Sequence, residues 1–140
     1  MVATTTTVRP LLVFDGDCAF CTSSVLWLGR RFPATFDLTP YQRADLAGYG
    51  LTVEQCHDRL QWLAHPDRGR EPAGRQEGAR AVVALLRAGG RSRGGAVAGM
   101  ATALGTLAFV PPTSWVAAGV YRLVAANRSR LPGGTPACRL

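Results

Sequence analysis

The chain has 140 residues, 47% of them hydrophobic, which fits one globular domain able to bury a core. Its formal net charge of +7 comes from arginine alone, because the sequence contains no lysine. The arginines are scattered and do not follow one helix face with interleaved aromatic residues, which argues against a nucleic-acid-binding protein. An arginine bias of this kind is typical of a GC-rich bacterial genome, so the charge by itself indicates no partner.

Residues 1–10 are rich in threonine and are expected to form a flexible N-terminus. They have neither a basic start nor a long apolar segment, so they do not match a signal peptide or a membrane anchor. We therefore expect a cytoplasmic protein. In that compartment thiols are kept reduced, and two closely spaced cysteines are more often catalytic or metal-bound than a structural disulfide.

The next segment joins an apolar strand to a helix that carries two cysteines. Residues 11–14 are predicted to form a buried strand, and Asp15-Gly16-Asp17 a turn. A helix is expected over residues 18–32, because Cys21 and three later apolar residues recur at helical spacing and share one face. The Cys-x-x-Cys pair of Cys18 and Cys21 is therefore expected at the first turn of a helix, which makes it a candidate redox site.

The position of the two sulfurs predicts different roles for them. Unpaired N–H groups and the helix dipole favour a thiolate at a helix N-terminus. Cys18, at or just before the first turn, is expected to be the exposed sulfur that attacks. Cys21, on the inward face, is expected to resolve the mixed disulfide. Asp15 and Asp17 are expected to support this site through turn and N-cap hydrogen bonds.

The α/β core is expected to span residues 11–90. After the first helix the pattern predicts a parallel strand at Thr35–Tyr41, followed by short helical turns at Ala44–Gly50 and Val53–His57. A third strand is predicted at Arg59–Ala64, with Leu60, Trp62 and Ala64 on one face, and it is followed by a turn at Pro66–Gly69 and a short fourth strand near Arg70–Pro72. A helix is predicted over Glu77–Ala88, with Ala81, Leu85 and Ala88 in register.

The C-terminal part is expected to be helical. Residues 94–121 carry no charge, and a run of that length is long enough for a membrane span. Pro111-Pro112 interrupts it, and it is rich in Gly, Ala and Thr, so two short packed helices at about 95–109 and 112–128 are expected, without membrane association. Residues 129–140 are expected to be a tail, and no role is assigned to its Cys138.

The segment Phe14-Asp15-Gly16-Asp17-Cys18-Ala19-Phe20-Cys21, together with Val120–Arg130, resembles the DCC family of thioredoxin-like thiol-disulfide oxidoreductases. The resemblance spans nearly the whole chain. It implies a thioredoxin-like α/β fold, βαβ then ββα, with a helical C-terminal extension. It also implies that Cys18 and Cys21 are the dithiol, and it names no substrate. We expect the dithiol to exchange disulfides with protein or small-molecule thiols, without a metal or organic cofactor.

One feature departs from the thioredoxin pattern. Thioredoxins place a cis-proline just before the third strand, beside the dithiol, and Cys56-His57-Asp58 stands at that position here. The usual contact with the substrate backbone is therefore in doubt. We assign no catalytic role to Cys56 or His57 from the sequence, because a lone histidine is more often a surface or satisfied core residue than a base.

Three other interpretations use the same residues. An Asp-Gly-Asp turn after an apolar strand is also found in haloacid-dehalogenase-like phosphatases, with Asp15 as nucleophile, but no acidic residue follows Glu77 to hold Mg²⁺. A zinc-binding or protein-interaction module would use Cys18, Cys21, Cys56 and His57, although adjacent ligands suit one ion poorly. The third interpretation makes Cys18 and Cys21 small core residues without chemistry.

Overall fold

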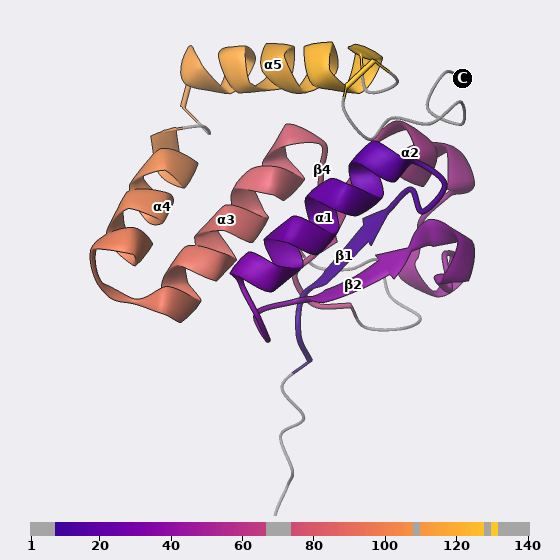
Figure 1. Cartoon of the computed structure of the whole chain (residues 1–140), viewed down its shortest axis with the longest axis horizontal. Helices are drawn as coiled ribbons and strands as arrows, with labels where there is room; N and C mark the ends of the chain where they lie inside the picture. The colour runs from indigo at the N-terminus through magenta and orange to yellow at the C-terminus, as the bar shows by residue number, and fades with distance from the viewer. Residues whose placement is uncertain (1–7, 67–73, 108–109, 128–129, 132–140) are drawn as a thin grey trace, which may run out of the picture.

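A computed structural model of the chain describes residues 8–66, 74–107, 110–127 and 130–131 (Figure 1). Its elements follow in chain order: β1 (Leu11–Phe14), α1 (Ala19–Arg31), β2 (Asp37–Pro40), the 3₁₀ turns η1 (Tyr41–Arg43) and η2 (Ala47–Tyr49), α2 (Val53–Asp58), β3 (Gln61–Leu63), β4 (Gln76–Glu77), α3 (Ala79–Arg93), α4 (Gly95–Leu107) and α5 (Thr113–Asn127).

The strands form one four-stranded sheet with the order β2-β1-β3-β4. β1 and β2 are parallel and joined through α1, with Phe14 opposite Pro40. β3 runs antiparallel to β1, with Leu12 opposite Trp62, and β4 is antiparallel to β3. This βαβ-then-ββα arrangement is a thioredoxin-like fold, as expected, and the helices α4 and α5 follow it.

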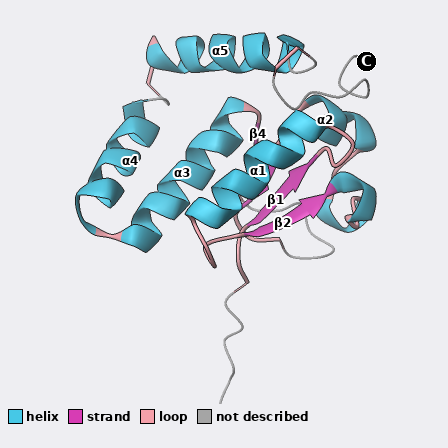
Figure 2. Ribbon diagram, viewed as in Figure 1, coloured by secondary structure: helices cyan, strands magenta, loops and turns pink. Residues whose placement is uncertain are grey.

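Every residue of β1 is buried, because the central strand contributes to a hydrophobic core on each face of the sheet. Leu12 and Phe14 belong to the core under α1 and α3, which lie over the same face of the sheet in Figure 2. Leu11 and Val13 belong to the second core, which is closed by α2 and the two 3₁₀ turns. The continuous apolar run of β1 therefore reflects burial on both faces.

Most sequence-predicted elements are confirmed with small shifts in their ends. Trp62 is buried in the core under α1 and α3, with Leu60 and Ala64 packed against it, as the alternation in the third strand predicts. The fourth strand expected near Arg70–Pro72 falls outside the described residues, and the strand paired with β3 is Gln76–Glu77. Glu77 therefore ends a strand and does not begin α3, which extends to Arg93.

The two C-terminal helices occur where the sequence predicts them, on either side of Pro111-Pro112. α4 packs along α3, and α5 crosses over the ends of α3 and α1 (Figure 1). The approach of α4 is close, since a Cβ added to Gly105 would lie 2.4 Å from Cγ of Arg87 on α3. Within the described part of the chain, none of the helices combines the length and the apolar character that crossing a bilayer requires.

Candidate active site

The turn between β1 and α1 is organised by the Asp15 carboxylate, which is only 4% exposed. Its Oδ1 accepts hydrogen bonds from the Asp17 N–H at 3.0 Å and from Nε2 of Gln42 at 3.1 Å. Oε1 of the same Gln42 accepts the Gly16 N–H at 3.1 Å, so one amide side chain is hydrogen-bonded to the turn at two residues. Glycine is required at position 16, because an added Cβ would lie 2.7 Å from Cβ of Pro40 on β2.

Cys18 is the N-cap residue of α1. It has an extended backbone, and its Sγ accepts the Cys21 N–H at 3.4 Å. This hydrogen bond satisfies one of the free N–H groups of the first turn. Of the turn and N-cap hydrogen bonds expected of Asp15 and Asp17, the structure shows the turn, in which the Asp15 carboxylate accepts the Asp17 N–H, while the cap is the cysteine itself.

The expected exposure of the two sulfurs is also wrong. Cys18 is fully buried, whereas Cys21 is partly exposed. Cys21 does share a helix face with Val25 and Leu28, as the spacing predicts, but that face borders a cavity along this part of α1. The extended backbone of an N-cap takes Cys18 off the helix, so helical spacing does not describe where its side chain lies.

The two sulfurs of the motif are not bonded to each other. Cys21 and Cys56 are not in disulfides, whereas the sulfur of Cys18 is disulfide-bonded. The burial of Cys18 therefore describes a sulfur that is already oxidised.

His57 contacts Asp15, and the sequence analysis gave this histidine no role. Its Nδ1 lies 3.3 Å from Oδ2 of Asp15, and its side chain is 30% exposed. The contact with the carboxylate is made through Nδ1, so Nε2 lies on the other side of the ring. His57 also borders the same cavity as Cys21. The signal in the sequence was its place just before the strand that pairs antiparallel with β1, which brings residue 57 to the end of β1.

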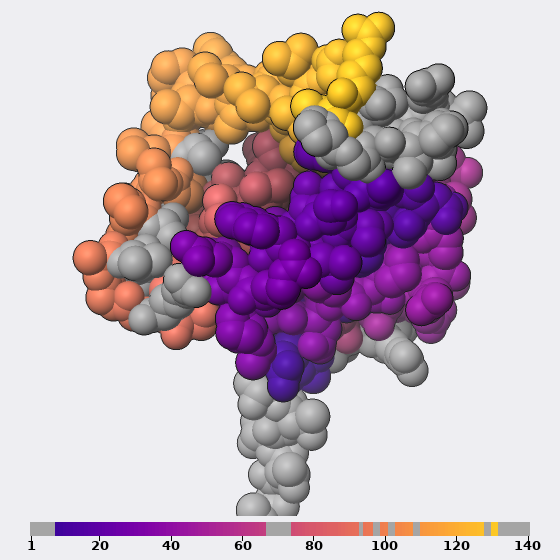
Figure 3. Space-filling model, viewed as in Figure 1, coloured from indigo at the N-terminus to yellow at the C-terminus, as the bar shows by residue number. Residues whose placement is uncertain are grey.

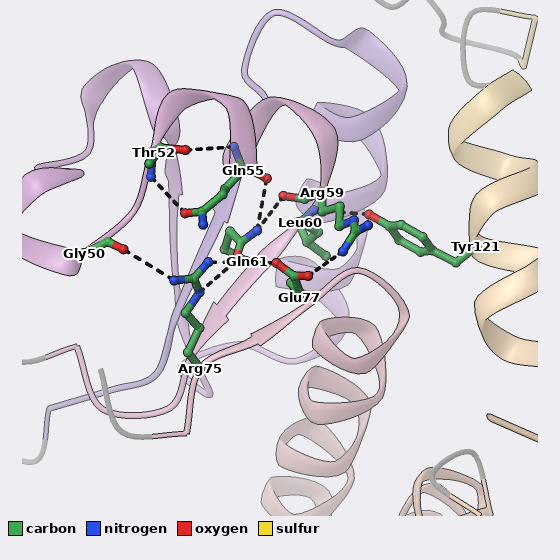
Figure 4. Close-up of polar contacts among 9 residues, drawn as sticks. All are labelled: Gly50, Thr52, Gln55, Arg59, Leu60, Gln61, Arg75, Glu77 and Tyr121. Atoms are coloured by element: carbon green, nitrogen blue, oxygen red, sulfur yellow. Dashed lines mark hydrogen bonds and ion pairs between the residues drawn. The ribbon is translucent and has the colours of Figure 1, made fainter. Parts of the chain in front are cut away.

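The end of α2, which carries His57, and the connection that follows it to β3 are held in shape by a buried amide (Figure 4). Gln61 is fully buried, and its Nε2 donates to the carbonyl oxygens of Gln55 at 3.1 Å and Arg59 at 3.3 Å. Its Oε1 accepts from Nε of Arg75 at 3.3 Å. A capping box of Thr52 and Gln55 fixes the other end of α2. The histidine is thus placed by a short segment with well-satisfied hydrogen bonds.

Two neighbouring groups are unsuited to ionise at neutral pH. Burial raises the pKa of the Cys56 thiol to about 11, and Cys56 packs in the core beneath α2. Burial, reinforced by the nearby charges of Asp15 and Asp17, raises the pKa of Tyr41 as well. The thiol of Cys56 is therefore a packing group at neutral pH.

A cavity of about 480 Å³ lies beside Cys21. It is bounded by one face each of α1, α3 and α5 and by the connection from α2 to β3. In Figure 3 the surface is recessed beneath α5, where atoms of α3 are seen at depth. Most of the lining side chains are apolar, and half of the polar ones belong to the segment from His57 to Arg59.

The structure also bears on the competing interpretations. Among the residues it describes, there is no group of three or more His, Cys, Asp or Glu side chains arranged to hold a metal ion. The Asp15 carboxylate, which a phosphatase would need as its nucleophile, is buried and engaged by Asp17, Gln42 and His57. These contacts give it the role of a structural acceptor.

Comparison with known proteins finds a matching family. The family model described as DCC1-like thiol-disulfide oxidoreductase matches residues 12–134, which is most of the chain. No curated protein and no solved structure matches. The chain belongs to the DCC1-like thiol-disulfide oxidoreductase family, as the motif around the two cysteines indicated.

Proposed function

Starting from membership in this family of oxidoreductases, we propose that the chain exchanges disulfides through Cys18 and Cys21, with protein or small-molecule thiols and disulfides as partners. Cys18 attacks and Cys21 resolves. The observation that carries this assignment is the hydrogen bond from the Cys21 N–H to Sγ of Cys18 at the N-cap of α1. A sulfur that accepts a helix N–H is stabilised as a thiolate, which is the form that attacks a disulfide.

The exchange proceeds in two displacement steps. The Cys18 thiolate attacks one sulfur of the substrate disulfide, the S–S bond breaks, and the other substrate sulfur leaves as a thiolate. The Cys21 thiolate then attacks Cys18 in the mixed disulfide, and the second substrate sulfur leaves as a thiolate. The substrate gains two electrons and the enzyme is left with a disulfide between Cys18 and Cys21; the reverse sequence oxidises a dithiol.

Cys21 has to lose a proton for the second step, and we propose that His57 takes it. Both side chains border the same cavity, and the Asp15 carboxylate, 3.3 Å from Nδ1, orients the imidazole beside it. Asp58 and Arg59 follow His57 in the chain and border the cavity too, so one negative and one positive side chain lie next to the histidine in the sequence. The leaving thiolate can recover the proton from His57, which returns the histidine to its neutral form.

Trapping of mixed disulfides tests the roles of the two cysteines. In a Cys138→Ser background, Cys21→Ser is expected to accumulate a mixed disulfide at Cys18 with a model disulfide, because the resolving thiol is gone. Cys18→Ser is expected to accumulate none. The adducts are counted by mass spectrometry after acid quenching and alkylation. Equal trapping by the two variants would show that the attack is not specific to Cys18.

A Cys56→Ala variant in the same background is the matched control. Its thiol is buried and has a raised pKa, so its loss should leave the trapping at Cys18 unchanged. If Cys56→Ala abolished exchange while the protein stayed folded, the pair of Cys18 and Cys21 would not be the working dithiol.

A further inference from the structure

The cavity beside Cys21 has the size and lining of a small-molecule site. Its volume of about 480 Å³ lies within the roughly 300–1,000 Å³ range common for such sites. The walls are mainly aliphatic and aromatic, and half of the residues able to hydrogen bond, His57, Asp58 and Arg59, come from the end of α2 and the connection before β3. Sites of this kind bind an apolar body and use a few polar groups to orient it.

The helix α5 forms one wall of the cavity with a single stripe of side chains. They are spaced by three, one, three and one residues, so they lie on one helix face: Ala117, Val120, Tyr121, Val124 and Ala125. Val116 and Ala118 lie on the same helix but do not border the cavity. This wall belongs to the C-terminal extension and not to the thioredoxin-like core.

Tyr121 fixes α5 over the cavity. Its hydroxyl accepts the Leu60 N–H at 3.2 Å, just before β3, and Figure 4 shows the ring reaching from α5 to that point. The ring also packs on the backbone of Gly78, where an added Cβ would lie 3.3 Å from Cε1 of Tyr121. The wall is thus attached to the sheet at a defined position, close to the Arg59–Glu77 ion pair.

Cys21 places chemistry in the wall of this cavity. It is not in a disulfide, it is partly exposed, and it lies on the α1 face that lines the cavity with Phe20, Ser24 and Val25. A ligand in the cavity therefore has its atoms beside the sulfur that, in the function proposed above, attacks the mixed disulfide.

We propose that the cavity is the subsite for the organic part of the substrate, and that the substrate is a small thiol or disulfide whose sulfur carries an apolar aryl or alkyl group. This inference rests on the proposed function. The apolar group occupies the space between α1, α3 and α5 while its sulfur is joined to Cys18. The covalent steps are those of the exchange described above and need no further reactant.

Binding without chemistry is the first arm of the test. Benzyl methyl sulfide is redox-inert and carries an aryl group next to sulfur. Titrated into the ¹⁵N-labelled protein, it is expected to shift amide signals along the lining faces of α1 and α5. Val120→Asn should weaken this binding because it places an amide in the apolar wall, whereas Val116→Asn, outside the cavity on the same helix, should not.

Exchange kinetics are the second arm. The mixed disulfides of cysteamine with benzyl mercaptan and with 2-mercaptoethanol share one half and differ in the other. The rate at which the protein reacts with each disulfide is divided by the rate at which free dithiothreitol reduces the same compound. We expect this ratio to be at least about tenfold higher for the benzyl compound, which is the factor given by burying one aryl group. Ala117→Leu, which fills the cavity, should remove the preference, and the neighbouring Ala118→Leu should keep it.

The outcomes separate this inference from the function on which it rests. Equal rates for both disulfides and no binding of the thioether would overturn the subsite and leave the oxidoreductase function standing. Binding of the thioether with no exchange above the rate of Cys18→Ser would overturn the function. A preference seen only when the aryl group is supplied by a Phe-Cys peptide would show that the cavity takes protein side chains, and the small-molecule assignment would be wrong.

Discussion

Replacing Tyr121 with phenylalanine removes the hydroxyl that accepts the Leu60 N–H at 3.2 Å and keeps the ring that packs on Gly78. The bond is partly buried, so water can only in part replace the lost acceptor. We expect the free energy of unfolding to fall by about 1 kcal/mol, the net value of such a hydrogen bond. Tyr121→Ala should cost at least about 1 kcal/mol more, since the contact of the ring with Gly78 is lost too.

Urea unfolding followed by circular dichroism measures this difference at 25 °C. Trp115→Phe is the control, because Trp115 also lies on α5 but is 73% exposed, and its stability should match the wild type. Tyr121→Phe should also lower the preference for the benzyl disulfide, while exchange with the 2-mercaptoethanol disulfide stays within about twofold. Unchanged stability in Tyr121→Phe, or an equal loss in Trp115→Phe, would refute the view that the hydroxyl anchors α5.

Two further predictions concern titrating groups. His57→Gln should slow release of the mixed disulfide near pH 7, and the effect should shrink toward pH 8.5, about the ordinary thiol pKa, because thiols then ionise without a base. His65→Gln, in an exposed turn, should behave as the wild type, and an equal loss in both variants would remove the proton role from His57. Burial raises the pKa of Cys56 from 9.0 to about 11, so its contribution to stability is complete below pH 9 and is lost as the pH rises through 11. Between pH 8 and 10 the wild type should lose about 1 kcal/mol more stability than Cys56→Ala in urea unfolding, and parallel pH curves would contradict this.

The helices and strands that depend mainly on residues close together in the chain could be predicted from the sequence. The run of four apolar residues before Asp15 and the helical spacing after Cys18 gave β1 and α1, and Pro111-Pro112 separated α4 from α5. These features depend on local backbone preferences and on which side of an element is buried, and both are written in short stretches of sequence.

The candidate site was less predictable because its contacts join distant segments. Asp15 meets Gln42 and His57, which come from η1 and α2, and only the strand pairing brings those segments to the end of β1. The exposure of the two sulfurs was predicted the wrong way round, because the N-cap geometry of Cys18 and the cavity beside Cys21 depend on that packing. The cavity itself needed α5, whose position over α1 no local pattern specifies.

The two hydrogen bonds of the Gln42 amide limit how the Cys-x-x-Cys motif can be transferred to another protein. Residues 14–21 contain both sulfurs and the turn. The side-chain amide that holds Asp15 and Gly16, however, belongs to Gln42, which comes after α1 and β2 in the sequence. Its reach depends on the pairing of Phe14 with Pro40. A graft of the eight-residue motif onto a foreign strand–helix junction would therefore carry the cysteines without the support of their turn. The smallest portable unit is the whole βαβ segment through η1, and a change in the length of α1 would have to leave that strand register intact.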